Sequence, residues 1–471
     1  IDRQDYLPLY FVFLKWYHLK MIRKNIKDLI NFIGQEICIS CWIDVRRDQG
    51  KMVFFDFRDM SGKVQGVVLP GSLAIDVAKI CRSEWVVSVQ GKVNSRPEKA
   101  TQKDKQNGNI ELEIIGIEVL SKAEDTPFEL GADVNLDTYL DYLPYTLRSD
   151  KARAIFSVQA EIVKVYRTFL NNEGFVEFQA PKLIGDDAEG GANVFEVPYF
   201  NEKVAHLATS PQFYKQMMVG VFERVFCIGN VFRAEKHSTT RHINEYTSLD
   251  IEMGFIKDHE DLMNLETRLM KTLAESLKKT CSDEFKLLNA AFPEVGETIP
   301  RLKLKEAQEI IFKETGRDNR QEPDLEPEDE RFLCEWAKKE HNSDFIFITH
   351  YPVSKRPMYT MEDTEDKGFT KSFDLLFRGV EITTGGQRRH NYENLIEGIK
   401  MKGLDPEKFS YYLQAFKYGM PPHGGWGMGL ERLTAKFLGL ANVKEATLFP
   451  RDINRIDTLL SDNKKSLDKK K

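Results

Sequence analysis

The chain has 471 residues, enough for two or three domains, and its 41% hydrophobic and 30% charged content is that of a globular protein. Its net charge of −6 excludes a uniformly basic surface, so any contact with nucleic acid must use local patches. Six scattered cysteines argue against a disulfide framework and predict a cytoplasmic protein, and no apolar run approaches the ~20 residues of a membrane helix.

The N-terminal part is predicted to be a short extension followed by a small β-barrel. Residues 1–20 precede Met21, a candidate start, and are expected to be an extension without function; a short partner-binding helix is the alternative. Between residues 21 and 122, strands are predicted at 37–45, 53–58, 64–69, 85–93 and 110–119, with a helix at 74–81. Five short strands and one helix predict an OB-fold.

One face of this barrel carries a candidate nucleic-acid surface. Arg47, Phe54 and Gln65 fall on or near the same sheet face, and an aromatic ring with cationic and amide neighbours can stack and read single-stranded bases. Spacing by itself favours the other interpretation, in which Phe54 belongs to the core. Cys38 and Cys41 form a C-x-x-C without a second pair, so we do not expect them to bind metal.

The remainder of the chain reads as a linker, a large domain and a tail. Residues 123–146 contain proline, are aperiodic and predict a linker, and residues 462–471 are a lysine-rich tail. The domain at 147–461 has apolar periodicity typical of helices at 152–171 and 258–279, and strands are predicted at 345–349 and 373–384. A glycine-rich loop at 185–192 is either a lid or a plain turn, and 282–343 is expected to be structural cover.

The stretch 231–255 carries the strongest functional pattern. Arg233 and Glu235 stand two apart and would share one face of a strand, beneath a loop that carries Arg241 and His242. A cation and a carboxylate under further cations suit a phosphate-bearing ligand that has an amine to recognise. The alternative is an exposed hairpin with salt-bridging charges. The sequence has no P-loop motif, and a Rossmann dinucleotide site is not expected.

Taken in order, these motifs resemble those of the class II aminoacyl-tRNA synthetases, most closely the aspartyl-tRNA synthetases of archaeal and eukaryotic type. The helix at 152–171 with its strand and Pro181 resembles motif 1, the stretch around Arg233 and Glu235 motif 2, and GMGLERL with Arg432 motif 3. TSPQFYKQ at 209–216 and FDLLFRGVEITTGGQRRH at 373–390 make the resemblance specific, and it covers residues 22–457. It implies an α+β fold, with an OB anticodon domain before an antiparallel sheet flanked by helices, and a homodimer through motif 1.

The resemblance also implies roles for individual residues. Arg233 and Arg432 would be the catalytic arginines, on the α-phosphate and the ATP tail. The other ATP contacts would be Glu235 at the adenine amino group, Tyr246 (where phenylalanine is more usual) stacked on the ring, and His242 and Glu381 near the phosphates. Mg²⁺ would lie on Asp374 and Glu381. L-Aspartate would be bound by Lys215 and Arg388 at its side chain and by Gln212, Asp250 and the lid residue Glu189 at its ammonium, with Ser210 and Thr384 nearby. The anticodon would be read by Arg47, Phe54 and Gln65.

The implied activity is that of an aspartate–tRNA ligase. Such an enzyme forms aspartyl-adenylate and pyrophosphate from L-aspartate and ATP, then transfers aspartate to the 3′ end of tRNA-Asp, and charging of tRNA-Asn stays open. The attacking carboxylate is already ionised and needs no general base. Rivals are an asparaginyl-tRNA synthetase, a related amide-forming enzyme and a non-catalytic RNA-binding module. Lys215 could also be a solvated helix lysine. Thr209, where glutamine is common, and the acidic lid approach at Asp186 depart from the family pattern.

Overall fold

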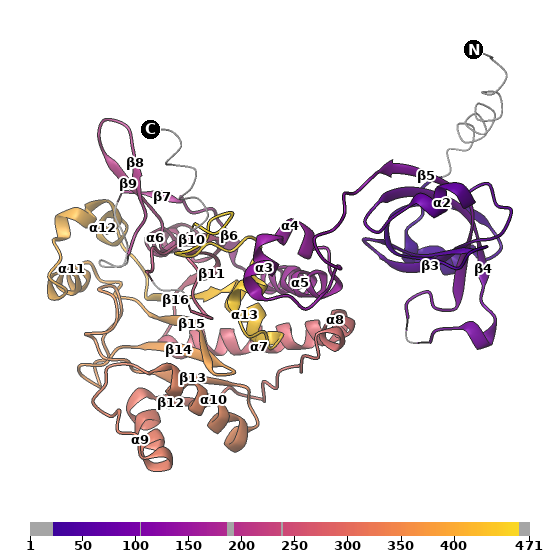
Figure 1. The fold of residues 1–471 in the computed structure, drawn as a ribbon. Helices are drawn as coiled ribbons and strands as arrows, with labels where there is room; N and C mark the ends of the chain where they lie inside the picture. The colour runs from indigo at the N-terminus through magenta and orange to yellow at the C-terminus, as the bar shows by residue number, and fades with distance from the viewer. Residues whose placement is uncertain (1–21, 104, 186–192, 237–238, 461–471) are drawn as a thin grey trace. The chain divides into compact units, whose positions relative to one another are not determined.

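The computed structural model describes residues 22–103, 105–185, 193–236 and 239–460 (Figure 1). The chain divides into two compact units, one ending at Glu129 and one starting at Leu130. This division falls inside the stretch 123–146 that is predicted to be a linker. The N-terminal extension, the lysine-rich tail, the lid approach and Glu189 lie outside the described residues, so the expectations for them stay expectations.

The first unit is a closed barrel of five strands in the order β1-β2-β3-β5-β4, which confirms the predicted OB-fold. Strand β1 pairs with both β2 and β4, and a parallel contact between β3 and β5 closes the barrel. Its elements are η1 (Ile26–Phe32), β1 (Glu36–Asp48), β2 (Val53–Asp59), β3 (Gly62–Val68), α2 (Ile75–Ile80), β4 (Val86–Ser95), η2 (Glu98–Ala100) and β5 (Ile110–Ser121).

Strand β2 shows which aromatic residues fill the barrel. Val53, Phe55 and Phe57 are fully buried in the core of the barrel, and the two phenylalanine rings stack with centroids 5.2 Å apart. Phe54 has the opposite parity and is only half-buried. The interpretation of Phe54 as a core residue, which spacing favoured, is therefore wrong.

Two short helices stand in the stretch predicted to be an aperiodic linker, α3 (Leu136–Asp141) and α4 (Leu143–Thr146). The Asn135 side chain caps α3 by accepting a hydrogen bond from the Thr138 N–H at 2.9 Å. Their apolar residues Leu140 and Leu143 are buried. Helices of fewer than two turns are too short to show a 3.6-residue period, which is why the sequence pattern missed them.

The second unit is built on an eight-stranded sheet in the order β12-β13-β14-β15-β16-β11-β10-β6. The pairs from β13 to β10 are antiparallel, as the resemblance implies, but the edge strands β12 and β6 run parallel to their neighbours, so the sheet is mixed. The strands are β6 (Val176–Glu177), β10 (Arg224–Phe232), β11 (Glu245–Gly254), β12 (Arg301–Lys303), β13 (Phe345–Thr349), β14 (Ser372–Phe377), β15 (Val380–Gln387) and β16 (His423–Gly429). A separate small sheet contains β7 (Leu183–Ile184), β9 (Val204–Leu207) and β8 (Glu196–Pro198).

The run 373–384, predicted to be one strand, is a hairpin of β14 and β15. Arg378 and Gly379 turn the chain with φ angles of +47° and +81°. The sequence pattern does not reveal this turn, because both strands are buried and the residues before and after it are similarly apolar. The turn matters for the site, since it places Asp374 and Glu381 on neighbouring strands rather than along one strand.

Helices cover both faces of the sheet. Helices α5 and α7 pack against each other, and α7 and α13 contact the sheet to close the main apolar core; α6 packs on β10 and β11 (Figure 1). The helices at 152–171 and 258–279 are confirmed as α5 and α7. No described helix combines the length and apolar character needed to cross a membrane. The helices are α5 (Asp150–Asn172), α6 (Gln212–Phe222), α7 (His259–Thr280), α8 (Ser282–Leu287), α9 (Leu304–Thr315), α10 (Pro327–His341), α11 (Tyr392–Met401), η3 (Pro406–Phe409), α12 (Ser410–Lys417), α13 (Leu430–Phe437) and η4 (Val443–Ala446).

The first residue of α7, His259, is buried without polar partners. It is 6% exposed, its ring lies against that of His350 with centroids 5.3 Å apart, and neither ring nitrogen has a hydrogen-bond partner among the described residues. Burial, followed by the neighbouring His350, lowers the pKa of His259 to about 4. The folded protein therefore resists protonation of a side chain that the unfolded chain protonates near pH 6.5.

We expect His259→Phe to make the protein less sensitive to acid. Between pH 7.5 and pH 5 the unfolded chain gains a proton at this residue and the folded chain does not, so the wild type loses about 2 kcal/mol of unfolding free energy here. Urea unfolding at the two pH values measures that loss. Replacing the exposed His341 by Gln is the control and should leave the loss unchanged; an equal loss in His259→Phe and the wild type would contradict the expectation.

Candidate functional site

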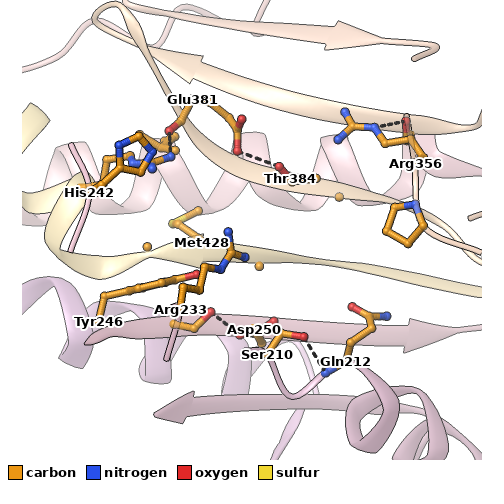
Figure 2. Close-up of a pocket in the computed structure, with 18 of the residues that line it drawn as sticks. Ser210, Gln212, Arg233, His242, Tyr246, Asp250, Arg356, Glu381, Thr384 and Met428 are labelled. Carbon is orange, nitrogen blue, oxygen red and sulfur yellow. Dashed lines mark hydrogen bonds between the residues drawn. The ribbon is translucent and has the colours of Figure 1, made fainter. Parts of the chain in front are cut away.

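A cavity of about 570 Å³ lies over strands β11, β15 and β16, beside α6 and α13. In Figure 2, Arg233, Tyr246 and Asp250 come from one side of this cavity and Glu381, Thr384 and Arg356 from the other. The residues that the sequence assigned to ATP and aspartate and that the structure brings together here are Ser210, Gln212, Lys215, Arg233, Glu235, His242, Tyr246, Asp250, Glu381, Thr384, Arg388 and Arg432.

A row of glycines on β16 opens the floor of the cavity. Trp426 and Met428 point into the main core, so Gly425, Gly427 and Gly429, which alternate with them, face the opposite side of the sheet. A Cβ on Gly427 would lie 3.1 Å from Asp250 Oδ1, and one on Gly425 would collide with the backbone and a side chain of β11. Side chains on this face of β16 would fill the space that the cavity occupies.

Strand β11 supplies the carboxylates of the floor through strict alternation. Leu249 and Ile251 join the main core, whereas Asp250 and Glu252 point to the cavity side. Asp250 is 2% exposed and Glu252 is fully buried. Two buried carboxylates on one strand face require cationic partners, because an unpaired buried charge is very costly.

Lys215 is the first of these partners. It lies on α6, is 1% exposed, and its Nζ donates to Asp250 Oδ1 and to the Trp426 carbonyl, both at 2.9 Å. Glu252 Oε2 lies 3.5 Å from the same nitrogen. The alternative interpretation of Lys215 as a solvated helix lysine is therefore wrong.

Arg388 is the second partner. Its Nε donates to Glu252 Oε1 at 2.9 Å and its Nη2 to the Gly425 carbonyl at 2.9 Å, while the guanidinium lies 5.4 Å from the centre of the Tyr359 ring. Two cations thus face two carboxylates, and the charges of the floor balance. The floor therefore attracts a ligand by directed N–H groups and not by an excess of positive charge.

Asp250, which the resemblance assigns to the ammonium of aspartate, is bound within the floor. Its Oδ1 accepts from Lys215 and its Oδ2 accepts from the Ser248 hydroxyl at 2.5 Å. In this geometry Asp250 orients Lys215.

Gln212 is held by a buried chain of hydrogen bonds. Its amide donates to Gln216 Oε1 at 2.9 Å, which also accepts from the Tyr412 hydroxyl at 3.0 Å. Gln216 Nε2 lies 3.0 Å from His423 Nε2, and His423 Nδ1 lies 2.8 Å from the Pro421 carbonyl. A carbonyl can only accept, so Nδ1 carries the proton of a neutral ring. Burial first of all lowers the pKa of His423 to about 4, which keeps the ring neutral.

The connection between β10 and β11 carries the cationic end of the cavity. Strand β10 ends at Phe232, so Arg233 and Glu235 follow the strand, and the prediction that they share a strand face is wrong. The Arg233 N–H donates to the Asn244 carbonyl at 2.8 Å, and the Asn244 amide donates to the Glu235 carbonyl at 3.3 Å. The connection folds back on itself through Asn244, which places the Arg233 guanidinium 5.7 Å from the centre of the Tyr246 ring.

His242 and Arg432 complete this end. His242 Nδ1 lies 2.6 Å from the Thr239 hydroxyl and its Nε2 lies 3.9 Å from Glu235 Oε2. Arg432, on α13, donates through Nη1 to the Glu381 carbonyl at 2.7 Å and through Nη2 to the Arg241 carbonyl at 3.4 Å. Cations from two distant segments therefore meet at one end of the cavity.

Glu330 on α10 connects these parts, although no sequence pattern pointed to it. One of its oxygens accepts from Arg241 Nη1 at 2.9 Å and from the Glu381 N–H at 3.2 Å. A stretch that was expected to be structural cover, 282–343, also brings Asp324 to the cavity wall, paired with Lys355 at 2.8 Å. The interpretation of that stretch as cover is wrong in these two places.

Asp374 and Glu381, the candidate metal carboxylates, lie on β14 and β15. Glu381 lines the cavity and accepts from the Thr384 hydroxyl at 2.8 Å, whereas Asp374 does not line the cavity and pairs with Arg356 at 2.8 Å. Burial raises the pKa of Asp374 to about 7, with Arg356 opposing the shift and Glu381 adding to it. Asp374 Oδ1 accepts no hydrogen bond from the described residues.

The oxygen atoms of Asp374 and Glu381 suit a hard cation that is held mainly by the phosphates of its substrate. Among the described residues, no three His, Cys, Asp or Glu side chains gather in a way that could hold a metal ion. Mg²⁺ prefers oxygen ligands and commonly takes one or two carboxylates together with substrate phosphates. A buried carboxylate oxygen that accepts no hydrogen bond and a second carboxylate in the cavity fit that mode.

A sequence signal for this wall of the cavity was available. It is the lysine–arginine pair Lys355 and Arg356 in the loop after β13.

The outer face of the barrel in the first unit carries the other predicted site. Arg47 pairs with Phe54 across β1 and β2, and Asp56 pairs with Gln65 across β2 and β3. Arg47 donates to both oxygens of Asp56, at 2.7 and 2.9 Å, and Gln65 donates to Glu111 at 2.8 Å. The structure therefore brings Arg47, Phe54 and Gln65 onto one outer face.

Known families match both units. Residues 37–120 match the family described as OB-fold nucleic acid binding domain, and residues 135–453 match the family described as tRNA synthetases class II (D, K and N). The aspartate–tRNA(Asp/Asn) ligase of Thermus thermophilus is 48% identical to the chain over 439 residues, which are 92% of this chain and all of that relative.

Two further relatives show the breadth of the likeness. The aspartate–tRNA(Asp) ligase of Picrophilus torridus is 40% identical over 442 residues, 92% of this chain and all of that protein. The solved structure of asparaginyl-tRNA synthetase from Pyrococcus horikoshii, complexed with asparaginyl-adenylate, has a TM-score of 0.85 and 29% identity over 92% of this chain and 99% of that one. The chain therefore belongs to the class II tRNA synthetases of the D, K and N group.

Proposed function

We propose that the chain is an aspartate–tRNA ligase of the cytoplasm. It activates L-aspartate with ATP, releases pyrophosphate, and transfers the aspartyl group to the 3′ end of tRNA-Asp. The observation that carries the choice of amino acid is the pair of buried cations, Lys215 and Arg388, in the floor of the cavity. Six free cysteines support a reducing compartment.

The floor distinguishes a carboxylate from an amide. Lys215 and Arg388 offer only N–H donors, and a substrate carboxylate accepts from both with charge-assisted hydrogen bonds. An asparagine side chain would turn its NH₂ donor toward one desolvated cation, and sites built on such polar matches can reject the wrong partner by ~10⁴-fold. Gln212 and Glu189 are assigned to the ammonium end, with Ser210 and Thr384 nearby and Asp250 orienting Lys215.

At the other end of the cavity, the cations receive ATP. Arg233 binds the α-phosphate, Arg432 the ATP tail and His242 the phosphates, while Tyr246 stacks on adenine and Glu235 accepts from its amino group. Asp374 and Glu381 hold Mg²⁺, which supplies charge neutralisation on the phosphates when bound. The aspartate carboxylate attacks as an anion, so these residues act by positioning and by electrostatic stabilisation rather than by proton transfer.

The barrel face with Arg47, Phe54 and Gln65 reads the anticodon by stacking and base-edge hydrogen bonds. Two of the matched relatives are named as ligases for tRNA(Asp) and for tRNA(Asp/Asn). The experiment that decides between these two substrate ranges measures charging of unmodified tRNA-Asp and tRNA-Asn transcripts side by side. Activation of asparagine in place of aspartate would assign the chain instead to the asparaginyl members of the family.

We expect Lys215→Leu to lower kcat/KM for aspartate in ATP–pyrophosphate exchange by at least ~100-fold, or ~2.7 kcal/mol, because a directed N–H to the substrate carboxylate is lost. Asparagine, already a poor substrate, should lose far less. Lys257→Leu replaces an exposed lysine and is the control. Circular dichroism first establishes that each variant is folded, since Lys215→Leu leaves Asp250 without its partner. Equal losses for both amino acids, or equal use of both by the wild type, would refute the assignment.

Phe54→Ala is expected to lower kcat/KM for tRNA while leaving aspartate-dependent exchange within about twofold. A lost base–aromatic stack costs ~1–3 kcal/mol, or roughly 5- to 150-fold. Phe55→Ala is the matched comparison, because its side chain lies in the barrel core and its loss should unfold the unit. Parallel losses in charging and exchange for a folded Phe54→Ala would show that Phe54 does not contact tRNA.

We also propose a homodimer through the region of α5 and β6. Strand β6 is a two-residue edge strand beside β10, and the apolar side chains of Val176, Phe222 and Phe255 are exposed near the same end of β10. Sedimentation at micromolar concentration should give twice the mass of one chain, and Phe255→Asp should shift the equilibrium toward monomer. A wild-type monomer under these conditions would contradict the proposal.

A further inference from the structure

The strongest remaining feature is the ion pair between Arg356 and Asp374. Arg356 Nη2 lies 2.8 Å from Asp374 Oδ2, and the two side chains are only 11% and 5% exposed. Arg356 comes from the loop after β13 and has no part in the nucleotide and amino-acid contacts proposed above. Its partner is a carboxylate that those contacts assign to Mg²⁺, so a fixed cation already stands where a metal ion is expected to act.

Besides the pair with Asp374, two further contacts hold the Arg356 guanidinium in place. Its Nε donates to the Ser372 hydroxyl at 3.1 Å, which in turn lies 2.8 Å from the Thr370 hydroxyl. Its flat face lies 3.9 Å from the centre of the buried Tyr351 ring. Ser372 and Asp374 are two residues apart on β14, so the planar guanidinium spans two side chains of one strand face. The guanidinium is therefore fixed on three sides, and Figure 2 shows Arg356 on the cavity wall with its hydrogen bond as a dashed line.

The consequence concerns the charge that a metal ion meets. When both are ionised, Asp374 and Glu381 carry two negative charges, and Arg356 cancels one of them at close range inside a buried wall. Asp374 Oδ1 accepts no hydrogen bond from the described residues and so remains able to coordinate a metal ion. A divalent cation alone is therefore weakly attracted, whereas a cation that arrives with ATP phosphates brings its own compensating charge.

We infer that Arg356 is a positioning residue that keeps the affinity of the nucleotide-free enzyme for divalent cations low, so that the metal binds together with ATP. This inference rests on the proposed function, because it takes Asp374 and Glu381 as the metal carboxylates. A purely structural role for Arg356, as an anchor of Asp374, makes the opposite prediction: freeing Asp374 would weaken metal binding.

The test titrates Mn²⁺ into the full-length protein at pH 8, without ATP or amino acid, and follows free Mn²⁺ by electron paramagnetic resonance. Arg356→Gln should bind Mn²⁺ at least ~10-fold more tightly than the wild type. Arg356→Lys, which keeps the charge, should stay within about threefold of the wild type. The double variant Arg356→Gln with Asp374→Asn should lose the tenfold gain in Mn²⁺ affinity. That loss would show that the added affinity comes from the Asp374 carboxylate.

Two further variants keep the test decisive. Arg356→Met retains an apolar stem over the Tyr351 ring and should show the same gain if Arg356→Gln does not fold. Lys355→Gln removes the same charge from the neighbouring residue, which pairs with Asp324 instead, and should change the affinity less than about threefold. Unchanged or weaker Mn²⁺ binding by folded Arg356→Gln and Arg356→Met overturns the inference. Because no substrate is present, failure of aspartate activation is a separate result.

Discussion

The buried ion pairs between Lys215 and Asp250 and between Arg388 and Glu252 are the interactions on which the site depends. All four side chains are nearly or fully buried, so removing either cation would leave a carboxylate uncompensated, at a cost of ~3–5 kcal/mol. The pairs connect α6, β11, and the segment after β15 to the same floor. Their charges balance, which lets a site of high charge density exist inside a folded domain and still offer directed donors to an acidic ligand.

The cavity above that floor exists because the backbone makes room for it. Gly425 and Gly427 of β16 face the same side as Asp250 and Glu252, and a side chain at either position would meet β11. The sharp turn at Arg378 and Gly379 then sets β14 beside β15, so that Asp374 and Glu381 approach one wall from adjacent strands. The residues proposed to bind the amino acid and those proposed to hold Mg²⁺ are therefore placed by the same sheet.

Connections between elements carry the remaining groups, and each is tied to the sheet by a few hydrogen bonds. Asn244 folds back the segment that carries Arg233, and Glu330 joins Arg241 to the backbone of Glu381. Arg432 bonds to the backbone on both sides of this contact. Such an arrangement holds cations that would repel one another at fixed positions before a polyanion binds, which is the condition for electrostatic catalysis without reorganisation.

The sequence by itself determined the OB-fold, the helices α5 and α7, and twelve of the residues that line the cavity, because period-two and period-3.6 patterns and ordered motifs are local properties of the chain. Only the tertiary structure decided the rest. It buried Lys215, turned Phe54 outward, ended β10 before Arg233 and brought Asp324 and Arg356 to the cavity wall. Each of these outcomes depends on which segments pack together, and a residue's partners across a sheet or a loop leave no period in the sequence around it.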